Sequence, residues 1–245
     1  MKTSYWLAAA CLVASASSFA NEGFKPIAVS DQELGELRGR FVMPGRIISF
    51  GIVMSSTWRN ASGDLIGAAT SMQIQSSTVQ PQFYVSTIKQ TGSGNTPTQG
   101  TGTVTGGAGL STTQGVTQSV RAAGDSNTAN NNVGINVTQS STAPVLATPQ
   151  GQVLTSGQTI SSSNAAGSVA VSAISGGVQL AIQASNNQGT ALQQVAQSGL
   201  LQNTTLLGNS NLVSNQTLLN VVLNNNINPA AGASQSLSQL KGLRN

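Results

Sequence analysis

Few side chains in this sequence could perform acid–base, nucleophilic or metal chemistry. The 245 residues include no histidine, one cysteine (Cys11) and six carboxylate side chains, and after Glu36 only Asp64 and Asp125 remain. Both lie in Gly/Ser/Asn-containing stretches that are typical of turns. The usual nucleophile–base pairs and zinc ligand sets are missing. We therefore expect no enzyme, no cofactor and no metal site.

The first twenty residues have the pattern of a secretory signal. Lys2 precedes the short apolar run WLAAACLV at 6–13, and small residues stand at 18 and 20. This predicts residues 1–20 as a signal peptide cleaved after Ala20. The apolar run is too short to span a bilayer, so we expect no membrane insertion. The chain would be secreted through the periplasm to the cell surface or the extracellular space, without cysteine or disulfide.

The rest of the chain is poor in charge and aromatic groups. Residues 126–240 contain no charged side chain, and no aromatic residue follows Tyr84. Aliphatic residues are instead mixed with Ser, Thr, Asn, Gln and Gly, a composition that favours stacked strands, amide ladders and self-association. The few basic residues form no cluster, which argues against nucleic-acid binding. Hydrogen bonding and packing are the available chemistry, which predicts a structural or adhesive protein.

Residues 21–46 form a charged, leader-like segment. Ser30 and Glu33 have the spacing of a capping box, which predicts a short helix over 31–38 that ends at Gly39. Leu34 and Leu37 would lie on one side of this helix. Two interpretations stay open for the segment, a recognition element and a helix that packs on the following sheet.

Residues 47–89 are predicted as a β-hairpin region. Apolar residues alternate through 48–58, turn residues occupy 60–64, and the alternation resumes over 66–74, with a third strand at 82–88. Trp58 is expected in the core of the sheet. If its ring were exposed, it would be a candidate contact for a partner.

The later regions are predicted from composition and from a short repeat. Residues 90–165 are expected to be a linker or loop-rich strands, and 225–245 a C-terminal tail. Within 166–224, leucines at 200, 206, 212 and 218 are six residues apart. An even spacing returns a strand to the same face, which predicts β-solenoid-like hexads in which Leu206 and Leu212 are equivalent. An amphipathic helix over 190–201 is the alternative. We thus expect an all-β fold: a short N-terminal helix, the hairpin region, then solenoid-like or stacked strands.

The segment 30–40, SDQELGELRGR, resembles a double-glycine leader read by C39 peptidases of secretion systems. Glu33, Leu34, Leu37 and Gly39 match its pattern, while Arg40 stands where a final small residue is usual. Together with the uncharged, Asn/Gln-rich remainder, the chain resembles components of the Fap functional-amyloid system of biofilm-forming bacteria. This resemblance implies amyloid fibril subunits and a secretion apparatus with a C39-type peptidase as partners.

The resemblance also separates a minor from a major component. Major fibril subunits are expected to carry long imperfect repeats and a Cys-X-X-Cys near the C-terminus, and inspection of this sequence finds neither. We therefore expect a minor, fibril-associated component of an extracellular amyloid matrix. The alternative is an independently folded β-solenoid adhesin or surface protein, which would stay a monomer where the fibril component self-associates.

The leader interpretation predicts that Leu34→Asp combined with Leu37→Asp blocks secretion or processing, because recognition needs the apolar side of the helix. Immunoblots of cell fractions and culture medium measure this. Gln32→Asp, on the opposite side of the helix, controls for added charge. Normal export of the double variant would contradict the leader interpretation.

Overall fold

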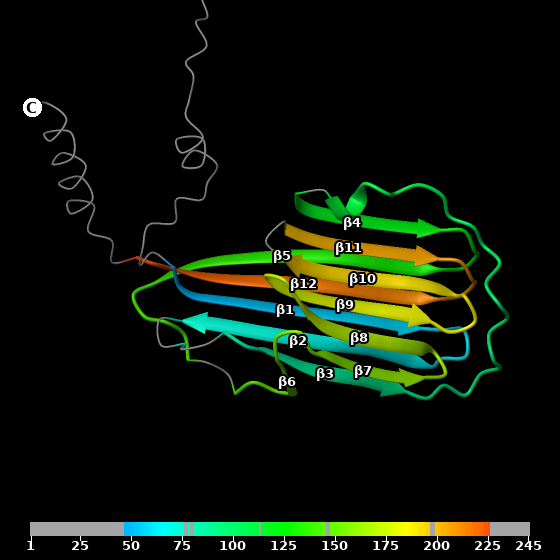
Figure 1. Cartoon of the computed structure of the whole chain (residues 1–245), viewed down its shortest axis with the longest axis horizontal. Helices are drawn as coiled ribbons and strands as arrows, with labels where there is room; N and C mark the ends of the chain where they lie inside the picture. Colours follow the sequence, from blue (N-terminus) through cyan, green and yellow to red (C-terminus); the bar gives the residue numbers. More distant parts are fainter. Residues whose placement is uncertain are drawn as a thin grey trace, which may run out of the picture. The chain divides into compact units, whose positions relative to one another are not determined.

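The structure is a computed structural model that describes residues 47–75, 78, 81–112, 114–145, 148–196 and 199–225. These residues form two open sheets that pack face to face (Figure 1). Sheet A has the strand order β5-β12-β1-β2-β3-β6, and sheet B has the order β4-β11-β10-β9-β8-β7. The all-β prediction is confirmed. The predicted signal peptide, the charged segment with its helix, and nearly all of the tail lie outside the described residues.

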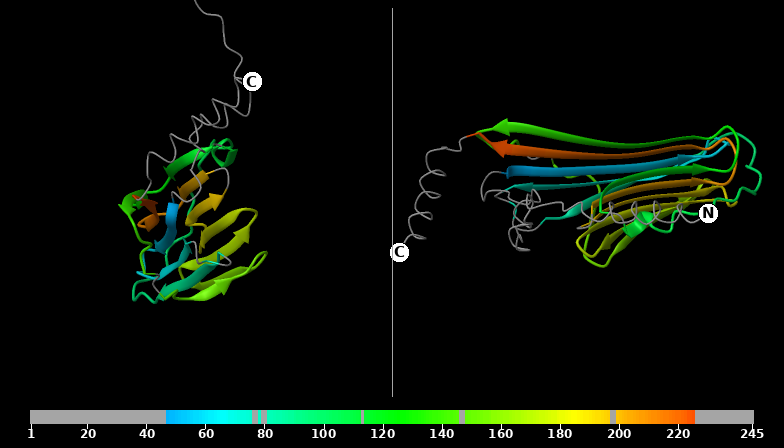
Figure 2. Two further views of the ribbon diagram at one scale, coloured as in Figure 1. Left: turned by 90° about the vertical axis from the view of Figure 1, so that its left-hand side faces the viewer. Right: turned by 90° about the horizontal axis from the view of Figure 1, so that it is seen from above.

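The four longest strands, β1, β2, β5 and β12, all belong to sheet A. Seen from above, β5, β12 and β1 project beyond the strands of sheet B at one end (Figure 2). In sheet A the bounds are Thr128–Ser140 (β5), Leu212–Asn224 (β12), Ile47–Arg59 (β1), Leu65–Gln75 (β2), Phe83–Gln90 (β3) and Gln152–Leu154 (β6). In sheet B they are Gly115–Ala122 (β4), Gly199–Leu206 (β11), Gly189–Ala196 (β10), Gly177–Ala184 (β9), Gly167–Ile174 (β8) and Thr159–Asn164 (β7).

The alternation in 47–75 produces the predicted hairpin. β1 and β2 pair antiparallel from Ser49↔Gln75 to Arg59↔Leu65, and β3 adds to β2. On β1 the side chains at even positions from 52 to 58 are buried between the sheets. Because side chains of a strand alternate between its faces, the odd positions of β1 from 53 to 59 lie on the outer surface of sheet A.

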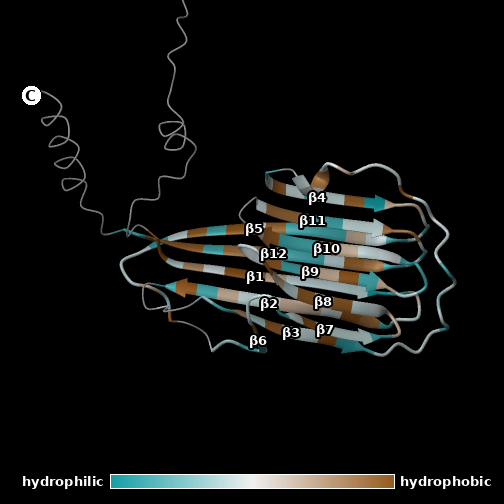
Figure 3. Ribbon diagram, viewed as in Figure 1, coloured by the Kyte–Doolittle hydropathy of each residue, from teal (hydrophilic) through white to brown (hydrophobic). Residues whose placement is uncertain are grey.

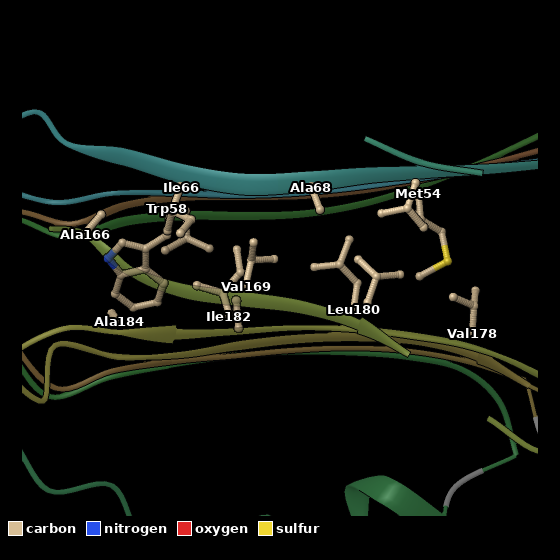
Figure 4. Packing of buried hydrophobic residues seen from close by; sticks show 14 of the residues in the cluster. Met54, Trp58, Ile66, Ala68, Ala166, Val169, Val178, Leu180, Ile182 and Ala184 are labelled. Atoms are coloured by element: carbon tan, nitrogen blue, oxygen red, sulfur yellow. The ribbon is translucent and has the colours of Figure 1, made fainter. Parts of the chain in front are cut away.

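Half of the interior is an apolar core. Figure 4 shows Met54, Trp58 and Ile66 of sheet A facing the aliphatic side chains of β8 and β9. The fully buried side chains of this group include Val169, Val178, Leu180 and Ile182. Each such burial contributes roughly 1.5–3 kcal/mol. This half of the sandwich is therefore the main source of hydrophobic stabilisation.

Trp58 is a core residue. Its side chain is 0% exposed, and its Nε1 donates to Asn211 Oδ1 at 3.1 Å. Gly189, at φ +139°, leaves room for the ring, because a Cβ there would lie 2.9 Å from it and would collide with the Thr205 carbonyl. The structure therefore supports the interpretation of Trp58 as a core residue, since a buried ring offers no surface to a partner.

The predicted hexads hold within β11 but do not continue from β11 into β12. Leu200 and Leu206 are both buried on β11, whereas Leu212 and Leu218 on β12 are 48% and 43% exposed. The even spacing preserves the face within each strand, but residues 207–211 turn the chain into the other sheet and break the alternation. Leu206 and Leu212 are thus not equivalent. The predicted solenoid is not confirmed, because β7 to β11 form an antiparallel meander.

The region 90–165 holds more strand than the sequence suggested. β5 is a regular strand of 13 residues in a region that was expected to be a linker or loop-rich strands. β4, at 115–122, was not expected at all. A short 3₁₀ turn, Leu110–Thr112, precedes β4. No helix in the described part of the chain is long and apolar enough to cross a membrane.

The turn between β1 and β2 is held by Asp64. Its carboxylate accepts hydrogen bonds from Ser62 Oγ at 2.6 Å and from the backbone N–H of Gly92 at 2.8 Å. These two bonds, the Ser62 bond foremost, lower the pKa of Asp64, against the opposing effect of burial. The charged form is therefore favoured by the folded state.

The lowered pKa of Asp64 predicts a pH dependence of stability. The stabilisation is fully present above the unfolded-state pKa of about 3.9 and is lost as pH falls through the lower folded-state pKa. Urea unfolding at a series of pH values should show the parent chain more stable than Asp64→Asn at pH 6, with the difference shrinking on acidification. A difference that is constant down to about pH 2 would contradict the assignment.

Burial of Trp58 predicts that Trp58→Ala lowers the free energy of unfolding by about 3–5 kcal/mol. Trp58→Phe keeps most of the apolar contact but leaves Asn211 without the indole donor, so its loss should be smaller, about 1–3 kcal/mol. Urea denaturation followed by circular dichroism measures both. A loss below about 1 kcal/mol for Trp58→Ala would be inconsistent with a buried ring.

Candidate assembly site: two stacked arches

Two strand–arc–strand units stack on each other in the second half of the interior. The first arch comprises residues 115–140, with β4 and β5 joined by an arc at 123–127. The second arch comprises residues 199–224, with β11 and β12 joined by an arc at 207–211. Each arch gives one strand to each sheet. β4 pairs parallel with β11, and β5 with β12, so that paired residues are 84 apart throughout.

The two arches are also related in sequence. At the offset of 84, eight aligned positions are identical. These pairs are Gly115/Gly199, Gln118/Gln202, Gly124/Gly208, Ser126/Ser210, Asn127/Asn211, Asn131/Asn215, Asn136/Asn220 and Val137/Val221. Most are residues that form ladders or turns. The chain therefore contains a long, imperfect repeat, which corrects our expectation that it has none. Of the two features expected of a major subunit, only the Cys-X-X-Cys is then missing from the sequence.

A ladder of glutamines crosses sheet B on its inner face. Gln118 Nε2 donates to Gln202 Oε1 at 2.8 Å, and Gln202 Nε2 donates to Gln193 Oε1 at 3.1 Å. Gln202 and Gln193 are 0% exposed. A carboxamide has both donors and an acceptor, so the side chain of each layer can form hydrogen bonds with the side chains of both neighbouring layers. The ladder runs from β4 through β11 to β10.

A second ladder is built on Asn215 of sheet A. Its Nδ2 donates to Asn131 Oδ1 and to Thr204 Oγ1, both at 2.8 Å. Its Oδ1 accepts a hydrogen bond from Ser56. Asn215 is 0% exposed, so every one of these bonds compensates for lost water. In Figure 3, β10 and β12 carry hydrophilic as well as hydrophobic stretches.

The arcs stack as closely as the strands. Asn211 donates its backbone N–H and its Nδ2 to Asn127 Oδ1, at 2.9 and 3.1 Å. Ser126 and Ser210 share the same left-handed conformation, with φ of 55° and 56°. A Cβ on Gly124 would collide with the Gly208 carbonyl directly beneath it. The missing Cβ of Gly124 therefore permits the close approach of the two arcs, whereas that of Gly208 leaves room for the Gln188 side chain.

The arches carry almost no charge. The first arch contains Arg121 and Asp125, and the second contains no charged residue. Arg121 donates through Nη1 to the Gly106 carbonyl and through Nη2 to Thr205 Oγ1 at 3.4 Å. Among the described residues, no group of three or more His, Cys, Asp or Glu side chains could hold a metal ion. The chemistry of this site is hydrogen bonding between layers.

Of the predicted site residues, only Trp58 belongs to the described part of the chain. Glu33, Leu34, Leu37 and Gly39 lie outside the described residues. Trp58 contacts the second arch through Asn211. Sequence reasoning missed the arches, although the pattern Gly-X₂-Gln-X₅-Gly-X-Ser-Asn-X₃-Asn, at 115–131 and again at 199–215, was the signal that could have found them.

Curated proteins of two organisms are similar to this chain over nearly its full length. One from Pseudomonas fluorescens, named functional amyloid subunit FapE, is 57% identical over 244 residues, which are 100% of this chain and 98% of the relative. One of the same name from Pseudomonas aeruginosa PAO1 is 43% identical over 239 residues, 96% and 92% of the two chains. No family model and no solved structure matches. The chain belongs to the FapE family of functional amyloid subunits.

Proposed function

We propose that this chain is a secreted, non-enzymatic structural protein, a minor fibril-associated component of an extracellular functional-amyloid biofilm matrix. It attaches to the fibril through strand edges, where it templates or caps the stack of subunits. The fibril subunits are its main partners. Export uses the signal peptide at 1–20, and a secretion apparatus with a C39-type peptidase reads Glu33, Leu34, Leu37 and Gly39.

The observation that carries this proposal is the parallel, in-register stacking of the two arches. Amyloid fibrils stack equivalent segments in register, with asparagine and glutamine ladders along the stack. Here one such step, with the ladders through Gln118–Gln202 and Asn131–Asn215, is built into a folded chain. The fold thus presents a fibril-like layer while the rest of the sandwich holds it in place.

The names of the relatives support the same function. Both are called functional amyloid subunits, and they match this chain over most of their own length. The alternative of an independent β-solenoid adhesin is less favoured, since no observation on the described residues supports a solenoid and neither relative is named for adhesion.

Fibril association predicts that the purified, signal-free chain sediments with preformed fibrils of the amyloid subunit with which it is secreted. The bound fraction should saturate at a low ratio of this chain to subunit, as expected for a minor component. Ultracentrifugation followed by quantitative immunoblotting measures it, with fibrils of an unrelated protein as the control. Equal recovery on both fibrils, or none on either, would contradict the proposal.

A further inference from the structure

The first arch is the last layer of both sheets. β4 ends sheet B and β5 ends sheet A, so each has one edge without a strand partner in the described part of the chain. Exposed edges are usually protected by short strands, proline, bulges or charge. β5 is 13 residues long and contains neither proline nor charge. The β5 edge therefore lacks the common protections against pairing with another chain, and the β4 edge carries a single charge, Arg121.

The interior of the first arch is uncovered. Val116 and Val120 on β4 are 55% and 45% exposed, although their partners Leu200 and Thr204 on β11 are 6% and 0% exposed. These four residues point to the same, inner side of sheet B, because paired residues of adjacent strands share a face. The second arch is thus covered by the first. The segment 102–107 contacts the first arch only beside Arg121 and Ala123, and it leaves Val116 and Val120 on the inner face exposed.

Apolar residues on the inner face of β5 are exposed in the same way as those of β4. Ile135 and Val137 are 61% and 55% exposed and pair with Leu219 and Val221 of β12. The projecting ends of these strands appear hydrophobic in Figure 3. Apolar interior positions that open on a bare strand edge indicate a surface that receives another layer.

The hydrogen bonds of the glutamine ladder all run in one direction, and an added layer would extend the ladder. Gln118 donates to Gln202, and Gln202 donates to Gln193. Gln118 is itself exposed, and no described residue donates to its Oε1. A glutamine at the matching position of an incoming arch would donate to this oxygen in the same way.

The opposite side of the arch pair is closed. β11 pairs antiparallel with β10, and β12 pairs antiparallel with β1, which ends the parallel repeat after two layers. The far edges of the sheets are β6, of three residues, and β7, of six residues. Short edge strands are poor templates. The described chain therefore has a single free arch face.

We infer that this free face binds one end of a fibril whose terminal layer is an arch with the same Gly, Gln, Ser-Asn and Asn pattern. The inference rests on the proposed function and specifies its binding surface. The second arch, seated on the first, shows the geometry of binding. A parallel stack has two different ends, and only one of them complements the free face, so the chain ends fibril growth in one direction and leaves the other end growing.

A second copy of this chain does not fit the same surface. Its matching face, on the far side of the second arch, is occupied by β10 and β1. Two free faces could meet only about a twofold axis, which would pair the strands antiparallel and lose the in-register ladders. The occupant is therefore the end of a fibril.

Imaging of single fibrils tests the direction of growth. Fibrils of the amyloid subunit with which this chain is secreted are tethered, supplied with fluorescent subunit and imaged with and without the purified, signal-free chain. Elongation should stop at one end and continue at the other. Arrest of both ends, or of neither, would overturn the one-ended assignment, even if the chain still sediments with fibrils.

A matched pair of variants tests the surface. Val120→Lys places an ammonium group inside the arch, where an added layer would bury it without a partner, so the concentration needed for half-maximal arrest should rise at least about tenfold. Val53→Lys is the control, because Val53 is 43% exposed, close to the 45% of Val120, but lies on the outer face of sheet A. It should arrest growth like the parent chain.

Three checks keep the outcomes distinct. Thermal unfolding must show both variants folded, and Val116→Lys replaces Val120→Lys if the latter unfolds. Equal arrest by the parent, Val120→Lys and Val53→Lys would reject the arch face while leaving fibril association intact. A parent chain that is a dimer by light scattering, with the dimer abolished by Val120→Lys, would overturn the inference in favour of self-pairing.

Discussion

Buried carboxamides must be hydrogen-bonded, and this requirement determines how the strands of both arches can pair. Gln193, Gln202 and Asn215 have no solvent exposure, and each would cost about 1–3 kcal/mol if it were left unpaired. Their partners lie at the same height in neighbouring strands or across the sandwich. A slip of one residue would turn the amides of a strand to its other face, so the amides fix the register of both arches.

This constraint divides the interior into two halves with different tasks. The apolar half between β1, β2, β8 and β9 supplies burial energy, which is tolerant of exchange among residues of similar volume. The amide half adds little net stability, but it selects one arrangement because its network must be fully satisfied. Trp58 lies where the halves meet, with its ring in the core and Nε1 bonded to Asn211. The arc of the second arch is thereby joined to the hydrophobic core.

The sequence predicted those parts of the fold whose signal is local. Alternation in 47–75 predicted the hairpin, and the composition predicted strands and amide ladders. Three features depended on distant residues and were missed. The hexad prediction assumed that the strand continues across 207–211, whereas these residues form an arc at which the buried face changes. Leu206 and Leu212 were therefore wrongly treated as equivalent. β4 has an exposed inner face and depends on parallel pairing with a strand 84 residues away. The repeat itself keeps identity mainly at ladder and turn positions, which are inconspicuous among so many other polar residues.

The scarcity of charge follows from the stacking as well. In-register layers place each side chain beside its equivalent at the strand spacing of about 4.8 Å, where like charges destabilise the pair. The two charged positions of the first arch, Arg121 and Asp125, face the neutral Thr205 and Asn209 of the second. A stack made of many copies of the first arch would set Arg121 on Arg121 and Asp125 on Asp125, whereas a terminal layer carries each charge once. The charge pattern therefore suits the first arch to the end of a stack and makes it a poor repeating unit.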